Sequence, residues 1–312
     1  MQFTIAIPAY KSKFLTECIQ SILAQTYADF ELIIINDCSP EPIDEIAGQF
    51  SDPRIRYYKN EVNIGAEHLV KNWNNALDKA SGEFFVMMGD DDRIEANYLQ
   101  EFAVLIGKYK DLDVFHCRSL MIDENSSPIK LTPSWPEYET VYDSIWHRLS
   151  GFRLQFISDF VYRTTALKNN GGFFDIPLAW ASDDITAYIA SKDLGIAHTN
   201  LPIFNYRQTR YTISSSGSAE LKIKAILMEK NWYDAFLAAV PSNENDKITR
   251  DNLCKMVGPF IQSKKLRTIA DSLAVNFFSN LLKWYKIRSK YNISSLDIVK
   301  SAFKSLKKRW LG

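Results

Sequence analysis

The stretch Glu83-Phe84-Phe85-Val86-Met87-Met88-Gly89-Asp90-Asp91-Asp92 decides the fold of this 312-residue chain. After Glu83 the side chains are apolar without alternation, which is typical of a parallel strand covered on both faces. A glycine and three consecutive carboxylates follow directly. Because ligands bind at the carboxyl ends of the strands in an open parallel sheet, the stretch predicts a buried strand that ends at an acidic binding edge.

Three earlier apolar runs supply partners for this strand. They are Phe3–Ile7, Glu31–Ile35 and Ile55–Tyr58, and each has the length and residue types of a strand. Helical spacing separates them: Ser12 is a candidate N-cap for one helix, and a second helix is predicted over Ala66–Ala80. Repeated β-α-β units predict an α/β fold with a doubly wound, mostly parallel sheet flanked by helices.

The pattern changes along the chain. After the first hundred residues, short strands are mixed with helices and turns, and from about Ala219 the spacing is almost entirely helical. We therefore expect a first domain over residues 1–215, with halves at 1–105 and 106–215, and a helical C-terminal region over residues 216–312.

The composition excludes several classes of protein. With 37 Lys+Arg, 37 Asp+Glu and 46% hydrophobic residues, the chain is neither disordered, nor collagen-like, nor basic enough overall to bind nucleic acid with its whole surface. No apolar stretch approaches the roughly 20 residues of a membrane span. The four cysteines are scattered and no secretory leader is visible, so we expect reduced thiols and a cytoplasmic location.

The charge is nevertheless uneven. Residues 286–312 hold eight basic residues and a single acid, Asp297, which gives this tail a charge of +7 and the rest of the chain −7. Apolar and aromatic residues are interleaved with the cations. A basic amphipathic helix of this kind either lies on an anionic membrane surface or packs on the protein with its lysines solvated. Nucleic acid is not an expected partner, because no recognised binding module accompanies the tail.

Acidic residues follow two of the predicted strands: Asp37 the second, and Asp90–Asp92 the fourth. Three adjacent carboxylates repel one another unless a cation neutralises them, and Mg²⁺ or Mn²⁺ bound together with a ligand's phosphates would do so. The alternative is a solvated turn whose acids cap a helix near Glu95. Both common Gly-rich phosphate-binding motifs are absent from the sequence, so a Rossmann dehydrogenase and a P-loop NTPase are disfavoured.

Several motifs in a fixed order carry a resemblance to a known family. They are Ile5–Tyr10, Asn36–Ser39, Asn63–Gly65, Ala80–Glu83, Gly89–Asp92, Gly171–Phe173, Ser182–Asp184, Gly195 and Tyr206-Arg207 with Ile213-Ser214. Together they resemble the family 2 inverting glycosyltransferases of the GT-A fold, of the bacterial surface-polysaccharide type. The resemblance covers about residues 1–215 and gives little beyond them.

The resemblance implies a donor site for a sugar nucleotide. Asp37 would accept a hydrogen bond from the nucleobase, most often uracil. Pro8, Ala9 and Tyr10 would shape the pocket for base and ribose, with the Tyr10 ring able to stack. The family often has a second Asp at the position of Asn36, and an amide there can still hydrogen-bond to a ribose.

The resemblance also implies a divalent metal, Mn²⁺ or Mg²⁺, on the diphosphate. Asp91 and Asp92 would be its ligands, and Asp90 would belong to the nucleotide-sugar site beside them. The family often has Asp at the position of Gly89, which leaves open which of the three acids binds the metal. Arg207 would pair with the diphosphate, although a structural ion pair is an equal alternative.

The acidic doublet Asp183-Asp184 corresponds to the catalytic dipeptide of the family. The resemblance implies that Asp184 is the general base that deprotonates the acceptor hydroxyl, and that Asp183 orients the acceptor. Acids at the start of a helix are the alternative. Trp180 would stack on an acceptor sugar, with an ordinary core role equally compatible with the sequence.

These features predict a metal-dependent, inverting hexosyltransferase that uses a UDP-sugar and a saccharide or lipid-linked saccharide acceptor in surface-polysaccharide synthesis. It would act in the cytoplasm or on the inner face of the cell membrane. The alternatives are a metal-dependent nucleotidyltransferase, and a non-catalytic GT-A module that binds nucleotides or glycans. The first should have a Gly-rich, Lys- or Arg-bearing loop after the first strand, and the second should lack Asp91 or Asp184.

Overall fold

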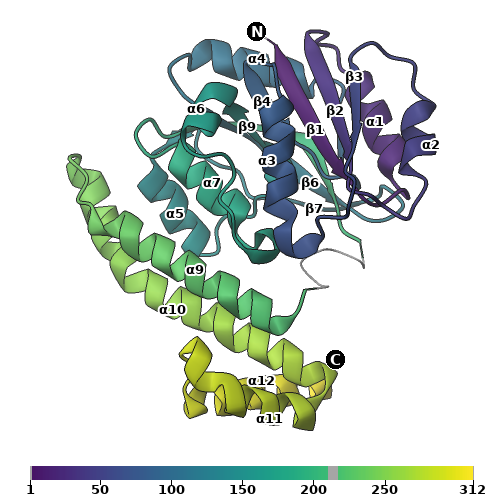
Figure 1. Cartoon of the computed structure of the whole chain (residues 1–312). Coiled ribbons are helices and arrows are strands. Elements are labelled where there is room, and N and C mark those ends of the chain that lie inside the picture. The colour runs from purple at the N-terminus through teal and green to yellow at the C-terminus, as the bar shows by residue number, and fades with distance from the viewer. Residues whose placement is uncertain (1, 210–216, 312) are drawn as a thin grey trace. The chain divides into compact units, whose positions relative to one another are not determined.

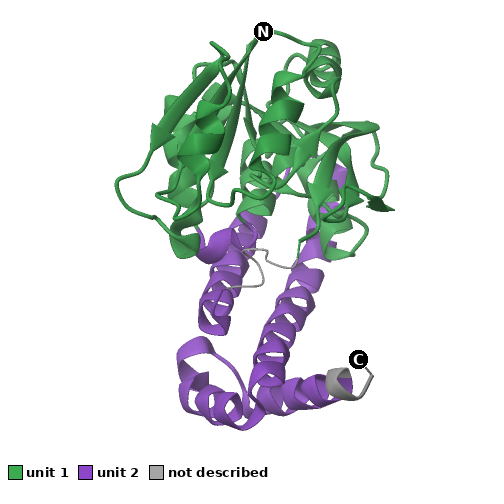
Figure 2. Cartoon of the chain, turned by 90° about the vertical axis from the view of Figure 1, so that its right-hand side faces the viewer, with its two compact units in different colours: residues 1–175, 182–212 green, residues 176–181, 213–312 purple. Residues whose placement is uncertain are grey.

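The computed structural model of the chain describes residues 2–209 and 217–311. It divides into two compact units (Figure 2). Unit 1 comprises Met1–Asp175 and Ser182–Thr212, and unit 2 comprises Ile176–Ala181 and Ile213–Gly312. The chain therefore leaves unit 1 for six residues, returns to it, and leaves it again.

Unit 1 is built on one mixed sheet, and the four strands that the sequence predicts lie side by side in one half of it (Figure 1). In the described residues the strands follow the order β3-β2-β1-β4-β9-β6-β10-β5, with β7 paired to β6 and β8 to β10. Their bounds are β1 Phe3–Ala9, β2 Phe30–Asn36, β3 Ile55–Lys59, β4 Phe84–Met87, β5 Arg93–Ile94, β6 Val114–Ile122, β7 Pro128–Leu131, β8 Tyr138–Glu139, β9 Phe160–Arg163 and β10 Ile196–Arg207.

The first four strands of the chain run parallel, so their carboxyl ends meet at one edge of the sheet. Phe3 of β1 pairs with Phe30 of β2 and with Phe84 of β4. Just past the strand ends, Asp37 N–H donates to the Ala9 carbonyl at 3.0 Å and Met88 N–H donates to the Ala6 carbonyl at 2.8 Å. The backbone thus carries the predicted acidic segments to the same edge.

The second half of the sheet is partly antiparallel. β9 runs antiparallel to both of its neighbours, β4 and β6, while β6 and β10 are parallel to each other. β5 is a two-residue strand that pairs antiparallel with β10, at Phe204 and Asn205. Because β5 begins directly after the acidic residues, this pairing brings residues 89–92 next to the end of β10.

Helices cover both faces of the sheet, because alternate side chains of the buried strands point to opposite faces. On one face, Ile5 packs in a core with residues of α1 and α4, such as Ile19 and Phe102. On the other face, the Phe173 ring contacts Phe85 of β4 and Trp73 of α3. The helices of unit 1 are α1 Leu15–Leu23, α2 Ile43–Gly48, α3 Leu69–Lys79, α4 Tyr98–Lys108, α5 Val141–Leu149, α6 Thr164–Asn169 and α7 Ser182–Ala190. The predicted α/β class is confirmed.

One predicted helix start is displaced. α1 begins at Leu15, and no side chain caps it. Ser12 contributes its backbone carbonyl, which accepts from Leu15 N–H at 3.2 Å, and its own N–H donates to Glu41 at 2.5 Å. The N-cap role predicted for the Ser12 side chain is therefore wrong.

Unit 2 is helical, as predicted for the C-terminal region. Its helices are α9 Ala219–Ala238, α10 Glu244–Val275, α11 Phe277–Ile287 and α12 Ser295–Leu311, with short 3₁₀ turns η3 Pro177–Ala179 and η4 Arg288–Tyr291. The side chains of Ser218 and Asn243 cap the first turns of α9 and α10. α12 packs against α10, where Ser301 Oγ donates to the Leu266 carbonyl at 3.1 Å. No helix in the described part of the chain is both long enough and apolar enough to cross a membrane.

Candidate functional site

Residues 89–92 form a tight acidic turn between β4 and β5. The Asp92 carboxylate accepts a 2.8 Å hydrogen bond from Arg207 N–H at the end of β10. A Cβ atom on Gly89 would lie only 2.7 Å from Asp92 Oδ2 and 3.3 Å from Asp91 Oδ1. A side chain at position 89 would therefore require the Asp92 carboxylate to move, and the glycine found there in place of the family's frequent Asp leaves this carboxylate where it is.

Asp90 ties the acidic turn to the end of β1. Its Oδ2 accepts from the backbone N–H groups of Tyr10 at 2.8 Å and Lys11 at 2.7 Å. Burial, together with the neighbouring Asp91 charge, raises the pKa of Asp90 to about 6 despite these two bonds. Asp90 thus fixes the backbone of the segment that the sequence predicts to shape the base and ribose pocket.

The carboxyl groups of Asp91 and Asp92 lie close together, and few positive charges lie near them. Burial raises the pKa of both carboxyl groups, and the Asp91 charge raises that of Asp92 further. The cation nearest to Asp91 is Lys11, with Nζ 3.8 Å from Oδ2. In the described residues, no group of three His, Cys, Asp or Glu side chains is placed to hold a metal. Two desolvated oxygen donors of like charge fit a hard divalent cation that takes its remaining ligands from phosphate and water.

Arg207 is buried beneath the acidic turn, and protein groups engage its guanidinium. Nε donates to the Asp91 carbonyl at 2.8 Å, and Nη2 donates to Glu17 at 2.7 Å. Nη1 donates to Ser126 Oγ at 2.9 Å, and the guanidinium lies 4.3 Å from the centre of the Phe14 ring. These contacts correspond to the structural ion pair, and pairing with a diphosphate stays a prediction.

Asp37, predicted to contact the nucleobase, is buried after β2 and organises a loop. Its Oδ1 accepts from the Asn60 side chain at 2.8 Å and from Ile64 N–H at 3.0 Å. Asn63 Nδ2 donates to the Asp37 carbonyl at 2.8 Å. The predicted motif Asn63–Gly65 therefore wraps around the Asp37 carboxylate.

The three residues predicted to shape the base pocket lie together at the carboxyl end of β1 and just beyond it. Ala9 is fully buried and Pro8 is half-buried, while the Tyr10 side chain is 42% exposed. An aromatic ring with free surface, held by the Asp90 bond to its backbone, is available to stack on a planar ligand.

The acidic doublet opens α7. Asp184 is buried, and Arg148 Nε of α5 donates to both of its oxygens, at 3.1 and 3.0 Å. Gln155 Nε2 donates to Oδ1 at 2.6 Å. Among the described residues Oδ2 accepts only from Arg148, so it keeps a lone pair for a further donor.

Asp183 is half-buried, and its environment disfavours the charged form. Burial is the main cause and the Asp184 charge the next, and together they raise the pKa of Asp183 to about 7. A carboxyl group with a pKa near neutrality can hold or release a proton at physiological pH.

Tyr206 of β10 is affected by the charges of both acidic groups, the turn at residues 89–92 and the doublet Asp183-Asp184. Burial, followed by the charges of Asp92, Asp91 and Asp183, raises the pKa of its phenol to about 12. The ring stacks on Phe156 with a centroid distance of 3.8 Å. The acidic turn and the doublet thus act electrostatically on one side chain.

Trp180, predicted to contact an acceptor, lies in the segment Ile176–Ala181 that belongs to unit 2. Its ring is half-buried, and Lys222 Nζ of α9 lies 5.2 Å from the ring centroid.

Sequence reasoning missed the partners that hold these acids. Arg148, Gln155 and Glu17 contact Asp184 and Arg207 from 29 to 190 positions away in the chain. No periodic pattern marks such pairs. Lys11 could have been found, since it follows β1 at the edge where the acids gather.

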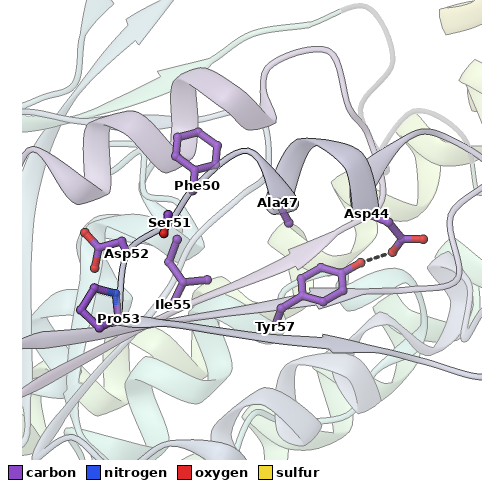
Figure 3. A pocket seen from close by; sticks show the side chains of 9 residues that line it. Asp44, Ala47, Phe50, Ser51, Asp52, Pro53, Ile55 and Tyr57 are labelled. Carbon is purple, nitrogen blue, oxygen red and sulfur yellow. Dashed lines mark hydrogen bonds between the residues drawn. The ribbon is translucent and has the colours of Figure 1, made fainter.

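A pocket of about 530 Å³ lies elsewhere in unit 1, between α2 and the edge strand β3 (Figure 3). Tyr57 on its wall donates a hydrogen bond to Asp44, and Phe50 and Ile55 supply apolar surface. It contains none of the predicted site residues.

Comparison with known sequences identifies relatives. Residues 4–168, just over half of the chain, match the family described as Glycosyl transferase family 2. The poly(ribitol-phosphate) beta-N-acetylglucosaminyltransferase TarS of Staphylococcus aureus is 27% identical over 210 residues, which are 63% of this chain and 34% of that protein. Glycosyltransferase GlyA of Streptococcus pneumoniae is 31% identical over 148 residues, 46% of this chain and 20% of that protein. The chain spans about a third of the length of TarS and less of GlyA.

Solved structures share the fold. The crystal structure of S. aureus TarS 1–349 in complex with UDP-GlcNAc has a TM-score of 0.65 at 18% identity, covering 99% of this chain and 92% of that one. Mannosyltransferase PcManGT of Pyrobaculum calidifontis, in complex with GDP-Man and Mn²⁺, has a TM-score of 0.56 at 13% identity, covering 98% and 87%. At these identities the likeness shows the fold alone.

Proposed function

The chain belongs to glycosyl transferase family 2, and from that premise we propose that it moves a sugar, with inversion, from a UDP-sugar to a hydroxyl of a saccharide or lipid-linked saccharide in surface-polysaccharide synthesis. One observation carries the proposal: the segment 155–158 contacts both acidic groups, because Gly89 N–H of the acidic turn donates to Ser158 Oγ at 3.1 Å and Gln155 Nε2 donates to Asp184 Oδ1 at 2.6 Å. A leaving diphosphate and an attacking hydroxyl need two such groups close to one reaction centre.

The donor side of the proposal rests on the edge where β1, β2 and β4 end. Asp37 would bind the base, with Pro8, Ala9 and the exposed Tyr10 ring around base and ribose. TarS, which shares the fold, is described in complexes with UDP-GlcNAc and with UDP. This supports a uridine nucleotide, and the sugar would be set by side chains around the pocket.

Asp91 and Asp92 would hold Mn²⁺ or Mg²⁺, because their oxygens are the desolvated pair of like charge. When bound, the cation neutralises charge that develops on the leaving diphosphate. Asp90, which is bonded to Tyr10 and Lys11 N–H, positions the base-binding segment. Arg207 would hold the turn in shape through its bond to the Asp91 carbonyl.

Asp184 would be the general base. The acceptor oxygen forms a bond to the anomeric carbon while the bond from that carbon to the diphosphate oxygen breaks, and the hydroxyl proton passes to Asp184 Oδ2. Arg148 and Gln155 fix the carboxylate from the other side, which is the arrangement of a base held by an orienting group. Asp183 beside it would orient the acceptor.

A panel of nucleotide sugars tests the proposed activity. We expect one UDP-sugar with Mn²⁺ to raise the melting temperature of the full chain by several degrees at a concentration about 100 times its Kd, because ligand binding adds about 2.7 kcal/mol of stability. UDP alone should stabilise and the free sugar should not. If no nucleotide sugar raises the melting temperature, the proposal is wrong. Release of pyrophosphate from a nucleoside triphosphate and sugar phosphate would point to a nucleotidyltransferase instead.

We further propose that unit 2 carries a surface for anionic membranes. α11 exposes Phe278, Leu282 and Tyr285 at spacings of four and three residues, which places them on one stripe. α12 exposes a second stripe, and its lysines 300, 304 and 307 line the side of that stripe. The residues of the second stripe are Leu296, Val299, Phe303 and Leu306. Exposed apolar stripes flanked by lysines are typical of helices that lie in a membrane interface.

Replacing two of these aromatic residues tests the surface. Phe278 and Phe303 are 78% and 70% exposed, so the double variant Phe278→Ser/Phe303→Ser should fold normally. We expect it to lower the partition coefficient onto vesicles with about 30% anionic lipid at least tenfold, since each buried aromatic ring contributes over 1 kcal/mol. The matched control is Val62→Ser/Val104→Ser, two exposed apolar residues of unit 1. Equal binding by both variants and the parent protein, measured by vesicle sedimentation, would contradict the proposal.

A further inference from the structure

A pocket lies within unit 2, with a volume of about 660 Å³. This size is typical of sites for small molecules. Its walls come from the η3 segment and from α9, α10 and α11. The side chains that matter below are Trp180, Lys222, Lys264, Arg267 and Asp271.

The backbone that presents Trp180 is held in an uncommon conformation. Leu178, Ala179 and Ala181 have φ values of 62°, 50° and 83°, in the left-handed region that side chains disfavour. Each such backbone conformation costs on the order of 1–3 kcal/mol of folding free energy and persists only where the surrounding packing imposes it. That packing is visible at Gly217, where a Cβ atom would lie 2.2 Å from Leu178 Cδ1. The tryptophan is therefore set in place by the helices of unit 2.

Lys222 faces the Trp180 ring, and in the described residues no carboxylate lies within ion-pair distance of its ammonium group. Burial lowers the pKa of Lys222, and the more distant Asp271 only partly offsets this effect. An ammonium group that has lost water without gaining a close counterion favours a ligand with negative charge.

The other cationic side chains that line the pocket give it a net positive charge. Lys264 pairs with the buried Glu229 at 2.5 Å. Arg267 Nε is 3.9 Å from Asp271 Oδ2, and its side chain is largely exposed. Asp271 is the single acid among the lining residues, against three cations. This charge balance disfavours a metal ion or a basic peptide as the ligand.

We infer that this pocket binds a saccharide that carries phosphate or carboxylate groups, with its sugar face on Trp180 and its anionic group at Lys222. Tryptophan offers a flat apolar surface with an N–H at its edge, which suits the C–H face of a sugar. A phosphate or carboxylate supplies the charge-assisted hydrogen bonds that Lys222 lacks. This inference rests on the proposed function in one respect, namely that the saccharide is the acceptor, which is the ligand that the sequence predicts for Trp180.

Calorimetric titration of the full chain, without donor, tests the pocket directly. The probes are three trisaccharides: neutral maltotriose, a galacturonate trimer and a maltotriose that carries a phosphate on a 6-hydroxyl. We expect the two anionic probes to bind at least tenfold more tightly than maltotriose, and the tighter of them identifies carboxylate or phosphate as the natural group. Lys222→Met, which keeps the apolar stem, should weaken that binding about tenfold. Trp180→Phe should weaken it less than Trp180→Ala.

The matched control is Lys255→Met, a lysine exposed on α10 outside the pocket. Equal weakening by Lys255→Met and Lys222→Met would show general attraction to a basic surface and would overturn the inference, as would equal affinity for maltotriose. Donor binding is measured separately by the melting assay. Anionic saccharides that bind through Lys222 while no nucleotide sugar binds would overturn the transferase proposal and leave the pocket standing.

Discussion

Replacing Asp184 with asparagine is expected to lower the rate constant of sugar transfer by about a thousandfold or more, while donor affinity stays within about threefold. The amide has the shape of the carboxylate and can still meet Arg148 and Gln155, but it cannot take a proton from the acceptor. Transfer is measured with saturating donor, and donor affinity by calorimetry. Asp193→Asn, an exposed acid shortly after α7, is the matched control and should behave like the parent protein.

The pH dependence separates the two acids of the doublet. The pKa of Asp183 is raised to about 7, mainly by burial and next by the Asp184 charge. Asp183 is proposed to orient the acceptor in its ionised form, so transfer should fall about tenfold for each pH unit below 7. Asp183→Asn removes the group that titrates in this range, so the acidic limb near pH 7 should disappear, with a loss in rate of only about tenfold. Full transfer by Asp184→Asn, with none by Asp183→Asn, would move the base to Asp183.

Replacing Asp91 with asparagine is expected to weaken donor binding in Mn²⁺ about a hundredfold or more. The change removes one of two proposed oxygen ligands, and a neutral amide binds a hard cation poorly. Calorimetry with and without Mn²⁺ measures the effect. Asp78→Asn, an exposed acid on α3, is the control. If the variant keeps the Mn²⁺ dependence of the parent protein, another residue holds the metal.

The same variant should be more stable than the parent protein when EDTA is present. Burial raises the pKa values of residues 90–92, and neighbouring acids raise those of Asp90 and Asp92 further, so at pH 7 the ionised forms cost folding free energy. Removing one charge should recover about 1 kcal/mol, or roughly 2 °C in melting temperature. A loss of donor binding together with a gain in stability distinguishes a ligand from a residue that supports the fold.

The sequence predicted one half of the sheet well because the runs that became β1, β2 and β4 are buried on both faces and lack alternation. The acids after β2 and β4 lie at the binding edge because of strand polarity alone. The sequence did not predict the antiparallel strands. β5 has two residues, too few to show a period, and β9 is as short as β4 but has no acidic segment after it.

The acids of the candidate site could be named from the sequence, but their supports could not. Arg148 reaches Asp184 from a different helix, 36 positions away, and nothing near either residue marks the pair. The space requirement at Gly89 depends on how the turn folds back on Asp92. Such contacts are set by tertiary packing, which local pattern does not encode.

The six-residue excursion at Ile176–Ala181 limits how the protein can be divided. These residues lie in the first two-thirds of the sequence but pack with the helices after residue 217, where Gly217 meets Leu178. A fragment cut between the sheet and the C-terminal helices would keep the excursion without its packing partners. Leu178 would lose its cover, and the left-handed backbone around Trp180 would lose the contacts that impose it. No single truncation point therefore separates the two units without removing contacts within unit 2, and truncated variants should keep both units.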